Sequence, residues 1–154
     1  MPATIDSFAP LLAAAEGLDL SDPETARAEL ERRFSPTGEE AQELRTDLIA
    51  LLDEGAIADR GEMPVKWGRV VKACDASRNF SIDVVLMNGA GPQHRHPRGE
   101  VNYCIALEGT PTFEDQAPGW VVMPEGSTHV PTVAGGTMLI VYLLPDGAIE
   151  FLGD

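Results

Sequence analysis

The second half of the chain, residues 61–154, is divided into short apolar runs by glycine and proline. These runs are rich in valine, isoleucine and aromatic residues, which favour strands, and the glycines and prolines between them favour turns. Several short strands at this spacing are typical of an antiparallel sandwich or a small barrel. The sequence therefore predicts a mainly β fold for this half. The runs read WGRVVKACD, NFSIDVVLMN, EVNYCIAL, GWVVMP and TMLIVYLLP.

The first 60 residues show the pattern of helices instead. The stretch SDPETARAELERRF begins with Ser21 or Asp22 as a cap and has Pro23 in its first turn. Its acids precede its bases, as the helix dipole favours. A second stretch, GEEAQELRTDLIALLDEGA, places leucines at helical spacing and ends at Gly55. A weaker helix is expected over residues 8–16.

The two halves are expected to form one domain. The chain of 154 residues has an ordinary single-domain length. No repeat, low-complexity tract or flexible linker separates the halves, and the leucine-rich helix face needs an apolar partner. We therefore expect residues 1–60 to form a helical cap on a barrel of residues 61–154, in one cooperative unit.

The charge and the cysteines limit the partners and the setting. Twenty-five acidic against eleven basic residues give a formal net charge of −14 and a pI near 4.4. Such a surface repels nucleic-acid phosphates and anionic membranes, so we expect neither as a partner. No basic residue precedes Arg27, as a secretory signal would require, and no run is long enough to span a membrane. Cys74 and Cys104 lack disulfide-framework or Cys-x-x-Cys spacing, which favours a reduced, cytoplasmic setting.

Two of the three histidines, His94 and His96, are separated by one residue on a predicted strand. Side chains at i and i+2 lie on one face of a strand, so both imidazoles can face one cavity. Glu100 follows the turn-like PRG, and His129 ends the segment PEGSTH, so both can converge on the pair. Three imidazoles and a carboxylate suit one divalent transition metal, whether iron, manganese, zinc, nickel or cobalt, and suit calcium poorly. We predict that these four residues bind such a metal.

This ligand pattern resembles that of the cupin superfamily. Its first motif reads His-x-His, three or four residues, Glu and then Gly, and the chain has HRHPRGE at residues 94–100. Its second motif, Pro-x-Gly-x-x-His, is matched by PEGSTH. The interval from Glu100 to Gly109 is longer than usual, and Val133 replaces a frequent Asn, but neither departure removes a ligand. The resemblance covers roughly residues 65–150 and implies a single cupin, a jelly-roll-type antiparallel β-barrel.

A narrower resemblance, to the small 4-hydroxylaminobenzoate lyase family, is carried by two blocks. They are GWVVMPEGSTHVPTVAGG and YLLPDGAIEF, behind an N-terminal helical segment. The resemblance implies a bacterial, metal-dependent lyase of aromatic degradation. Its substrate would be a small aromatic carboxylate, 4-hydroxylaminobenzoate, which reacts with water to give 3,4-dihydroxybenzoate and ammonia.

Several residues are candidates for substrate binding or catalysis in such an enzyme. Arg98 is the cation nearest the ligands in sequence and would bind the carboxylate. Asn102 shares its strand phase with Glu100 and would hydrogen-bond the hydroxylamino group. Trp120 or Tyr142 would stack on the ring. Glu100 would also set the charge of the metal and the basicity of its bound water, so it is a catalytic candidate.

Each candidate has a structural alternative. A His-x-His pair alone is more often a polar strand face, and only the additional ligands favour a metal. Trp120 and Tyr142 also fit a barrel core, since aromatic side chains dominate small cores. Arg98 also fits a solvated loop, and Cys104 fits a buried, inert thiol.

Two other classes of function fit the same ligands. One is a different metal cupin enzyme, a dioxygenase or an isomerase acting on a small organic acid. The other is a small-molecule-binding cupin without catalysis. Such binding cupins often carry an attached DNA-binding domain, and the chain has no basic helix-turn-helix pattern. Cupin barrels commonly pair through sheet edges, so we expect a homodimer.

Overall fold

Residues 4–152 are described by the computed structural model, and in them helices precede strands. After a 3-10 turn (Ile5–Phe8), the helices are α1 (Ala9–Ala15), α2 (Pro23–Arg33) and α3 (Glu39–Asp53). The strands are β1 (Arg60–Glu62), β2 (Val65–Val71), β3 (Phe80–Met87), β4 (His94–His96), β5 (Glu100–Phe113), β6 (Gly119–Met123), β7 (Ser127–His129), β8 (Val133–Pro145) and β9 (Glu150–Phe151), with a 3-10 turn at Asp75–Ser77. The fold is mainly β with an N-terminal helical segment, as the sequence predicts.

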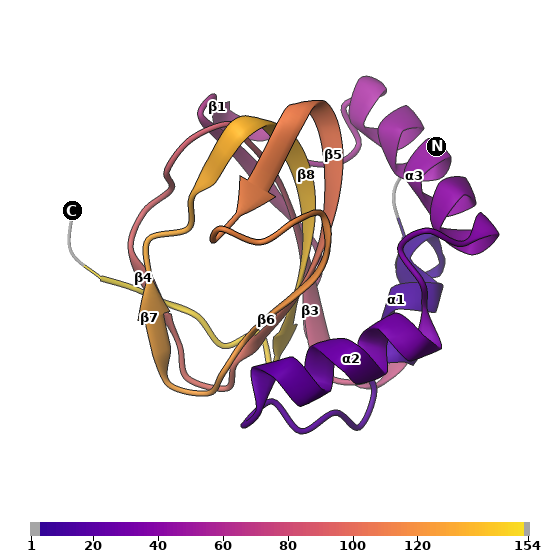
Figure 1. Ribbon diagram of the computed structural model, residues 1–154, viewed down its shortest axis with the longest axis vertical. Helices are drawn as coiled ribbons and strands as arrows, with labels where there is room; N and C mark the ends of the chain where they lie inside the picture. The colour runs from indigo at the N-terminus through magenta and orange to yellow at the C-terminus, as the bar shows by residue number, and fades with distance from the viewer. Residues whose placement is uncertain (1–3, 153–154) are drawn as a thin grey trace.

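The strands form two antiparallel sheets. The larger has the order β1-β2-β3-β8-β5-β6, and the smaller has the order β7-β4-β9. Because β3 pairs with β8 and β8 with β5, strands distant in sequence are neighbours in space. In Figure 1, β4 and β7 lie on one side of the large sheet and the helices lie on the other. The arrangement is of the jelly-roll type predicted, although hydrogen bonds do not join the two sheets into a closed barrel in the described residues.

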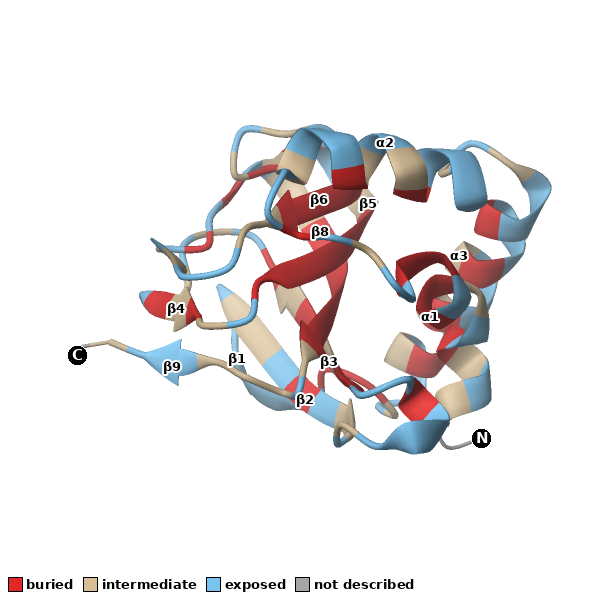
Figure 2. Ribbon diagram, turned by 90° about the horizontal axis from the view of Figure 1, so that it is seen from below, coloured by how far each residue is buried: buried red, intermediate tan, exposed pale blue. Residues whose placement is uncertain are grey.

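The central stretches of β5 and β8, residues 100–105 and 138–144, are buried on both faces, because helices cover one face and the small sheet faces the other. Alternate residues of β5 therefore have different neighbours. Tyr103 and its flanking residues Val101 and Ile105 belong to the core shared with the helices. Glu100, Asn102 and Cys104 point to the opposite, inner face, where Cys104 packs with a second apolar cluster. Figure 2 shows these strands as the most continuously buried part of the chain.

The helices begin and end much as the sequence predicts. Asp22 caps α2 by accepting a hydrogen bond from the backbone N–H of Thr25 at 3.3 Å, and Pro23 is its first residue. Gly55 follows α3 with a φ of +76°, a conformation that glycine adopts readily. The buried leucines of α3 belong to the same apolar core as the outer face of the large sheet. Among the described residues, no helix is long and apolar enough to cross a membrane.

Candidate metal centre

The small sheet brings the three histidines together. In the antiparallel pair of β4 and β7, His94 lies directly opposite His129. His96 lies on the same face of β4 as His94, and both are buried, whereas Arg95 between them points outward and pairs with Glu150 at 3.5 Å. The strand alternation expected from the sequence is therefore present.

Glu100 reaches the histidines because the chain turns sharply between β4 and β5. Gly99 has a φ of +84°, and its backbone N–H donates to the carbonyl oxygen of His96 at 3.1 Å. A Cβ atom at this position would lie 3.0 Å from the carbonyl oxygen of Met123, so a larger residue would strain the turn. The turn makes Glu100 the first residue of β5 and places its fully buried carboxylate beside the imidazoles.

The ligand atoms of the four residues all lie within 4.8 Å of one another. Nε2 of His129 lies 2.9 Å from Nε2 of His94 and 3.0 Å from Nε2 of His96. Oε2 of Glu100 contacts Nε2 of His96 closely and lies 3.9 Å from Nε2 of His94. Four potential ligands from three strands thus point at one spot.

This donor set fits a divalent transition metal. Bonds of about 2.1 Å to one ion at right angles place adjacent ligand atoms about 3 Å apart. Nε2 of His129 lies at this spacing from Nε2 of His94 and from Nε2 of His96. Within the described residues, neither oxygen of Glu100 accepts a hydrogen bond of good geometry, although the carboxylate is fully buried. A buried carboxylate without donors is costly unless a cation compensates it. A metal bound by His94, His96, Glu100 and His129 would supply that charge.

The protonation of His94 also suits metal binding. Burial lowers the pKa of His94 to about 4, against a smaller opposing effect of the Glu100 carboxylate. The imidazole is therefore neutral near pH 7, and a neutral imidazole is the form that binds metal.

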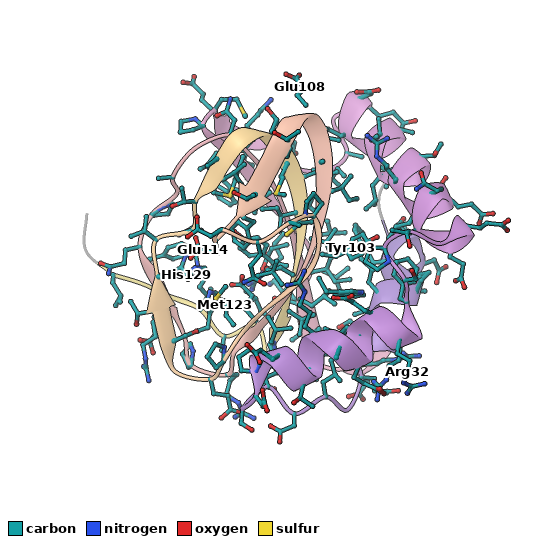
Figure 3. The ribbon with its side chains drawn as sticks, in the orientation of Figure 1. Arg32, Tyr103, Glu108, Glu114, Met123 and His129 are labelled. Atoms are coloured by element: carbon teal, nitrogen blue, oxygen red, sulfur yellow. The ribbon has the colours of Figure 1, made fainter. Side chains whose placement is uncertain are left out.

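A carboxylate that sequence reasoning missed lies beside the third histidine. Oε2 of Glu114 lies 3.1 Å from Nδ1 of His129, and Oε1 of Glu114 accepts the backbone N–H of Thr132 at 2.8 Å. Figure 3 shows Glu114 and His129 side by side near β7, away from the helices and Tyr103. Metal-binding histidines usually donate their second N–H to such a partner, which fixes the tautomer.

A cavity of about 510 Å³ adjoins the cluster, and His94 forms part of its wall. Its size falls within the range of small-molecule sites, about 300–1,000 Å³. The wall is mostly apolar, with Val85 and Met87 from β3 and Phe151 from β9. Tyr142 from β8, a sequence candidate for stacking on a substrate ring, also lines it. Such a cavity suits a small, mainly apolar ligand.

Two polar side chains on the inner face have unused hydrogen-bonding capacity. Asn102 is fully buried, and neither its amide nitrogen nor its amide oxygen has a partner in the described residues. The hydroxyl of Tyr142, which lies opposite Asn102 in the β5–β8 pair, donates only weakly, to Sδ of Met87 at 3.8 Å. Burial raises the pKa of Tyr142 well above its usual value, so the hydroxyl stays protonated.

The structure does not bring Arg98 or Trp120 to the cluster. Arg98 lies in the loop before β5, its side chain is 59% exposed, and it pairs with Asp146 at 3.5 Å. Trp120 lies opposite Tyr103 and faces the helices, where its indole N–H donates to the carbonyl oxygen of Phe34 at 2.9 Å. The aromatic ring therefore belongs to the core between sheet and helices. Cys104 is buried as expected, and burial raises the pKa of its thiol.

The fold and the cluster of three histidines and one glutamate define a cupin with a candidate metal site. A family model described as "PnbB: 4-hydroxylaminobenzoate lyase" matches residues 10–151. The chain belongs to this 4-hydroxylaminobenzoate lyase family.

Two curated relatives bear the same name. A 4-hydroxylaminobenzoate lyase from Pseudomonas putida is 30% identical over 149 residues, which cover 82% of this chain and 85% of the relative. Another, from Nocardioides sp. (strain LMS-CY), is 32% identical over 91 residues, or 54% of each chain. Relatives named as lyases indicate that the chain is an enzyme.

Solved structures with some likeness to the chain include two cupins. An RmlC-like cupin protein from Ralstonia eutropha is 16% identical with a TM-score of 0.44, covering 60% of this chain and 62% of that one. A cupin-like protein from Thermotoga maritima is 16% identical with a TM-score of 0.42, covering 58% of this chain and 77% of that one.

Proposed function

We propose that the chain is a metal-dependent lyase that converts 4-hydroxylaminobenzoate and water to 3,4-dihydroxybenzoate and ammonia. The observation that carries the proposal is the buried His94, His96, Glu100 and His129 cluster beside a largely apolar cavity. Membership of the lyase family supports the choice among cupin reactions. The metal would be one divalent transition ion per chain, and iron, manganese, zinc and nickel all fit this donor set.

The reaction needs no external oxidant or reductant. The N–O bond breaks and the nitrogen leaves as ammonia, which reduces the nitrogen by two electrons. The ring supplies these electrons and ends with oxygen on two carbons. One water is consumed overall, so the atoms balance. The site must therefore promote cleavage of the N–O bond, give one water molecule access to the ring, and transfer protons to the departing nitrogen.

The four ligands and the cavity wall divide these tasks. A bound metal would supply Lewis acidity toward an oxygen of the substrate or toward water. The Glu100 carboxylate would offset part of the positive charge of a bound metal. As a member of the ligand cluster, it would also be able to accept a proton from a group on that metal. Glu114, which lies 3.1 Å from Nδ1 of His129, would orient this ligand when the metal is bound. The apolar cavity wall limits water around the ring, which strengthens the electrostatic interactions inside the site.

Asn102 and Tyr142 have the position and the free polar atoms to orient the substrate. Asn102 lies on the same face of β5 as Glu100, and Tyr142 lies opposite it on β8. The Asn102 amide can both donate and accept, which matches a hydroxylamino group. The Tyr142 hydroxyl donates a proton in a hydrogen bond, since burial keeps it protonated. We propose that these two side chains hold the nitrogen-bearing end of the ring near the cluster.

The proposal is tested by measuring ammonia and 3,4-dihydroxybenzoate released from 4-hydroxylaminobenzoate after loading with each metal in turn. Glu100→Gln should lower kcat about 100-fold, equivalent to about 2.7 kcal/mol, and move KM less. The matched control is Glu108→Gln, which removes an exposed acid from the same strand and should keep the wild-type rate. If metal-loaded wild type forms neither product, the lyase proposal fails. Oxygen consumption with iron bound would then favour a dioxygenase.

The expected homodimer is a further part of this proposal. Sedimentation equilibrium of the metal-loaded protein should give a mass near twice that of one 16.5 kDa chain. A monomer at micromolar concentration would contradict it.

A further inference from the structure

Arg69, a cation of the cavity wall, is left unused by the proposed reaction. It projects from β2 into the wall that also includes His94 and Tyr142. We infer that Arg69 binds the carboxylate of the substrate and that Asp83 positions Arg69 for this task. The inference rests on the proposed function and names the residue that selects an anionic aromatic ring.

Arg69 is held in one orientation by a two-point contact. It lies directly opposite Asp83 in the β2–β3 pair. Nε of Arg69 donates to Oδ1 of Asp83 at 2.8 Å, and Nη2 donates to Oδ2 at 3.2 Å. Ser81 supports this arrangement, because its hydroxyl donates to Oδ2 of Asp83 at 3.3 Å. This geometry engages one edge of the guanidinium and leaves Nη1 for another acceptor.

Cross-strand register places Arg69 in line with Asn102, which lies two residues after Glu100 on the same face of β5. Arg69 pairs with Asp83, Asp83 with Tyr142, and Tyr142 with Asn102, on the neighbouring strands β2, β3, β8 and β5. Residues directly opposite each other in a sheet share a face. These four side chains therefore form one polar row across the inner face. The row spans three strand spacings, about 14 Å, a length that a benzoate ring and an arginine side chain can bridge together.

Charge also favours Arg69 over other cations. Among the described residues that line the cavity, Arg69 is the only lysine or arginine. Arg98, the candidate from sequence proximity, is paired with Asp146 outside this wall. A carboxylate entering a cavity of a chain with a net charge of −14 needs a local positive partner.

A purely structural role explains the Arg69–Asp83 pair less well. The Arg69 side chain is 38% exposed, and ion pairs at that exposure contribute about 0–1 kcal/mol. Stability alone therefore gives little reason for a charged pair beside Val85, Trp67 and Phe151. Recognition of an anion at the open end of the cavity gives a specific reason.

The test measures binding without turnover. The metal-loaded protein is titrated calorimetrically with 4-aminobenzoate, which lacks the N–O bond, and with 4-aminobenzamide, its uncharged counterpart. Wild type should bind the carboxylate, and Arg69→Gln should weaken that binding about 10- to 100-fold, the loss of one charge-assisted hydrogen bond of roughly 1.5–3 kcal/mol. Binding of the amide should change less than twofold. Arg69→Lys should recover part of the lost affinity, because lysine restores the positive charge but lacks the planar guanidinium that can bond Asp83 and the substrate at once.

Two comparison variants complete the test. Lys66→Gln removes one positive charge from the opposite face of β2 and should leave both affinities unchanged. Arg98→Gln tests the competing cation and should also leave 4-aminobenzoate binding unchanged. The inference is overturned if Arg69→Gln binds 4-aminobenzoate as wild type does, if it weakens carboxylate and amide equally, or if wild type binds no 4-aminobenzoate. If binding follows the prediction but no product forms, the lyase proposal alone fails.

Discussion

The Glu114 carboxylate lies 3.1 Å from Nδ1 of His129, on the opposite edge of the imidazole from the other ligands. With Nδ1 beside this carboxylate, Nε2 of the same ring faces His94 and His96. Partners of this kind typically contribute a factor of about 10–100 to metal affinity. We therefore expect Glu114→Gln to weaken metal binding by that factor.

The measurement for Glu114 is competition with a chromophoric chelator. Asp115→Asn is the matched control, because Asp115 is the exposed neighbour of Glu114 and no contact links it to the cluster in the described residues. Equal metal affinity in Glu114→Gln and wild type would show that the contact does not support the ligand.

The low pKa of His94 predicts how the stability of the metal-free protein depends on pH. The pKa is about 4 in the folded chain and about 6.5 in the unfolded chain. Between these values the unfolded chain holds the extra proton, so the free energy of unfolding falls as pH falls. The contribution is complete above pH 6.5, and up to about 3 kcal/mol is lost by pH 4.

Urea unfolding at several pH values, measured for wild type and His94→Gln, separates the contribution of His94 from those of other titrating groups. The decrease between pH 6.5 and 4 should be smaller in His94→Gln than in wild type, because the variant lacks the titrating imidazole. An identical decrease in both proteins would mean that another group causes it.

Asn102 gives a prediction in which stability and activity respond differently. Its buried amide has no partner in the described residues, so Asn102→Leu removes no internal hydrogen bond. We expect an unchanged or higher Tm, because burying an unpaired amide is unfavourable. If the amide contacts the substrate, kcat/KM should fall about tenfold or more. Full activity in a correctly folded variant would show that the Asn102 amide does not contact the substrate.

The sequence predicted the convergence of the four side chains of the cluster, because short-range geometry brings most of them together. His94 and His96 share a strand face by alternation, and Glu100 is only one glycine turn away. His129 comes from a distant segment, and its place at the end of the turn-like PEGSTH, together with the resemblance to cupins, connected it to the others. Arg69, Asp83 and Glu114 were not singled out, because strand register places the first two in the cavity wall and the turn after β5 places Glu114 beside His129, and no local sequence pattern specifies either.

Trp120 shows why an aromatic residue was assigned to the wrong face. The strand GWVVM is buried on both sides, so its pattern has no polar alternation to mark the inner face. Only the register, with Trp120 opposite Tyr103, shows that it points to the helices. Arg98 was chosen for its closeness in sequence, but the turn at Gly99 directs its side chain to the surface.

The position of Trp120 also bears on the predicted single folding unit. Trp120 is fully buried, and its hydrogen bond to Phe34 joins β6 to the end of α2. Trp120→Phe should lower the free energy of unfolding by about 1–3 kcal/mol while leaving KM nearly unchanged. Because sheet and helices share one core, calorimetry should show one unfolding transition in both proteins. Two separated transitions would contradict the single folding unit. A large change in KM would show that Trp120 contributes to substrate binding.

The central claim is that a metal held by the histidine–glutamate cluster makes the chain a 4-hydroxylaminobenzoate lyase. The most direct measurement is a titration of metal-free protein with the most activating divalent metal, following ammonia and 3,4-dihydroxybenzoate together. The account predicts activity that rises linearly and levels off at one metal per chain, with the two products formed in equal amounts. It also predicts that His96→Ala neither binds the metal nor forms product. Full activity without metal, or one bound metal per chain with neither product formed, would contradict the account.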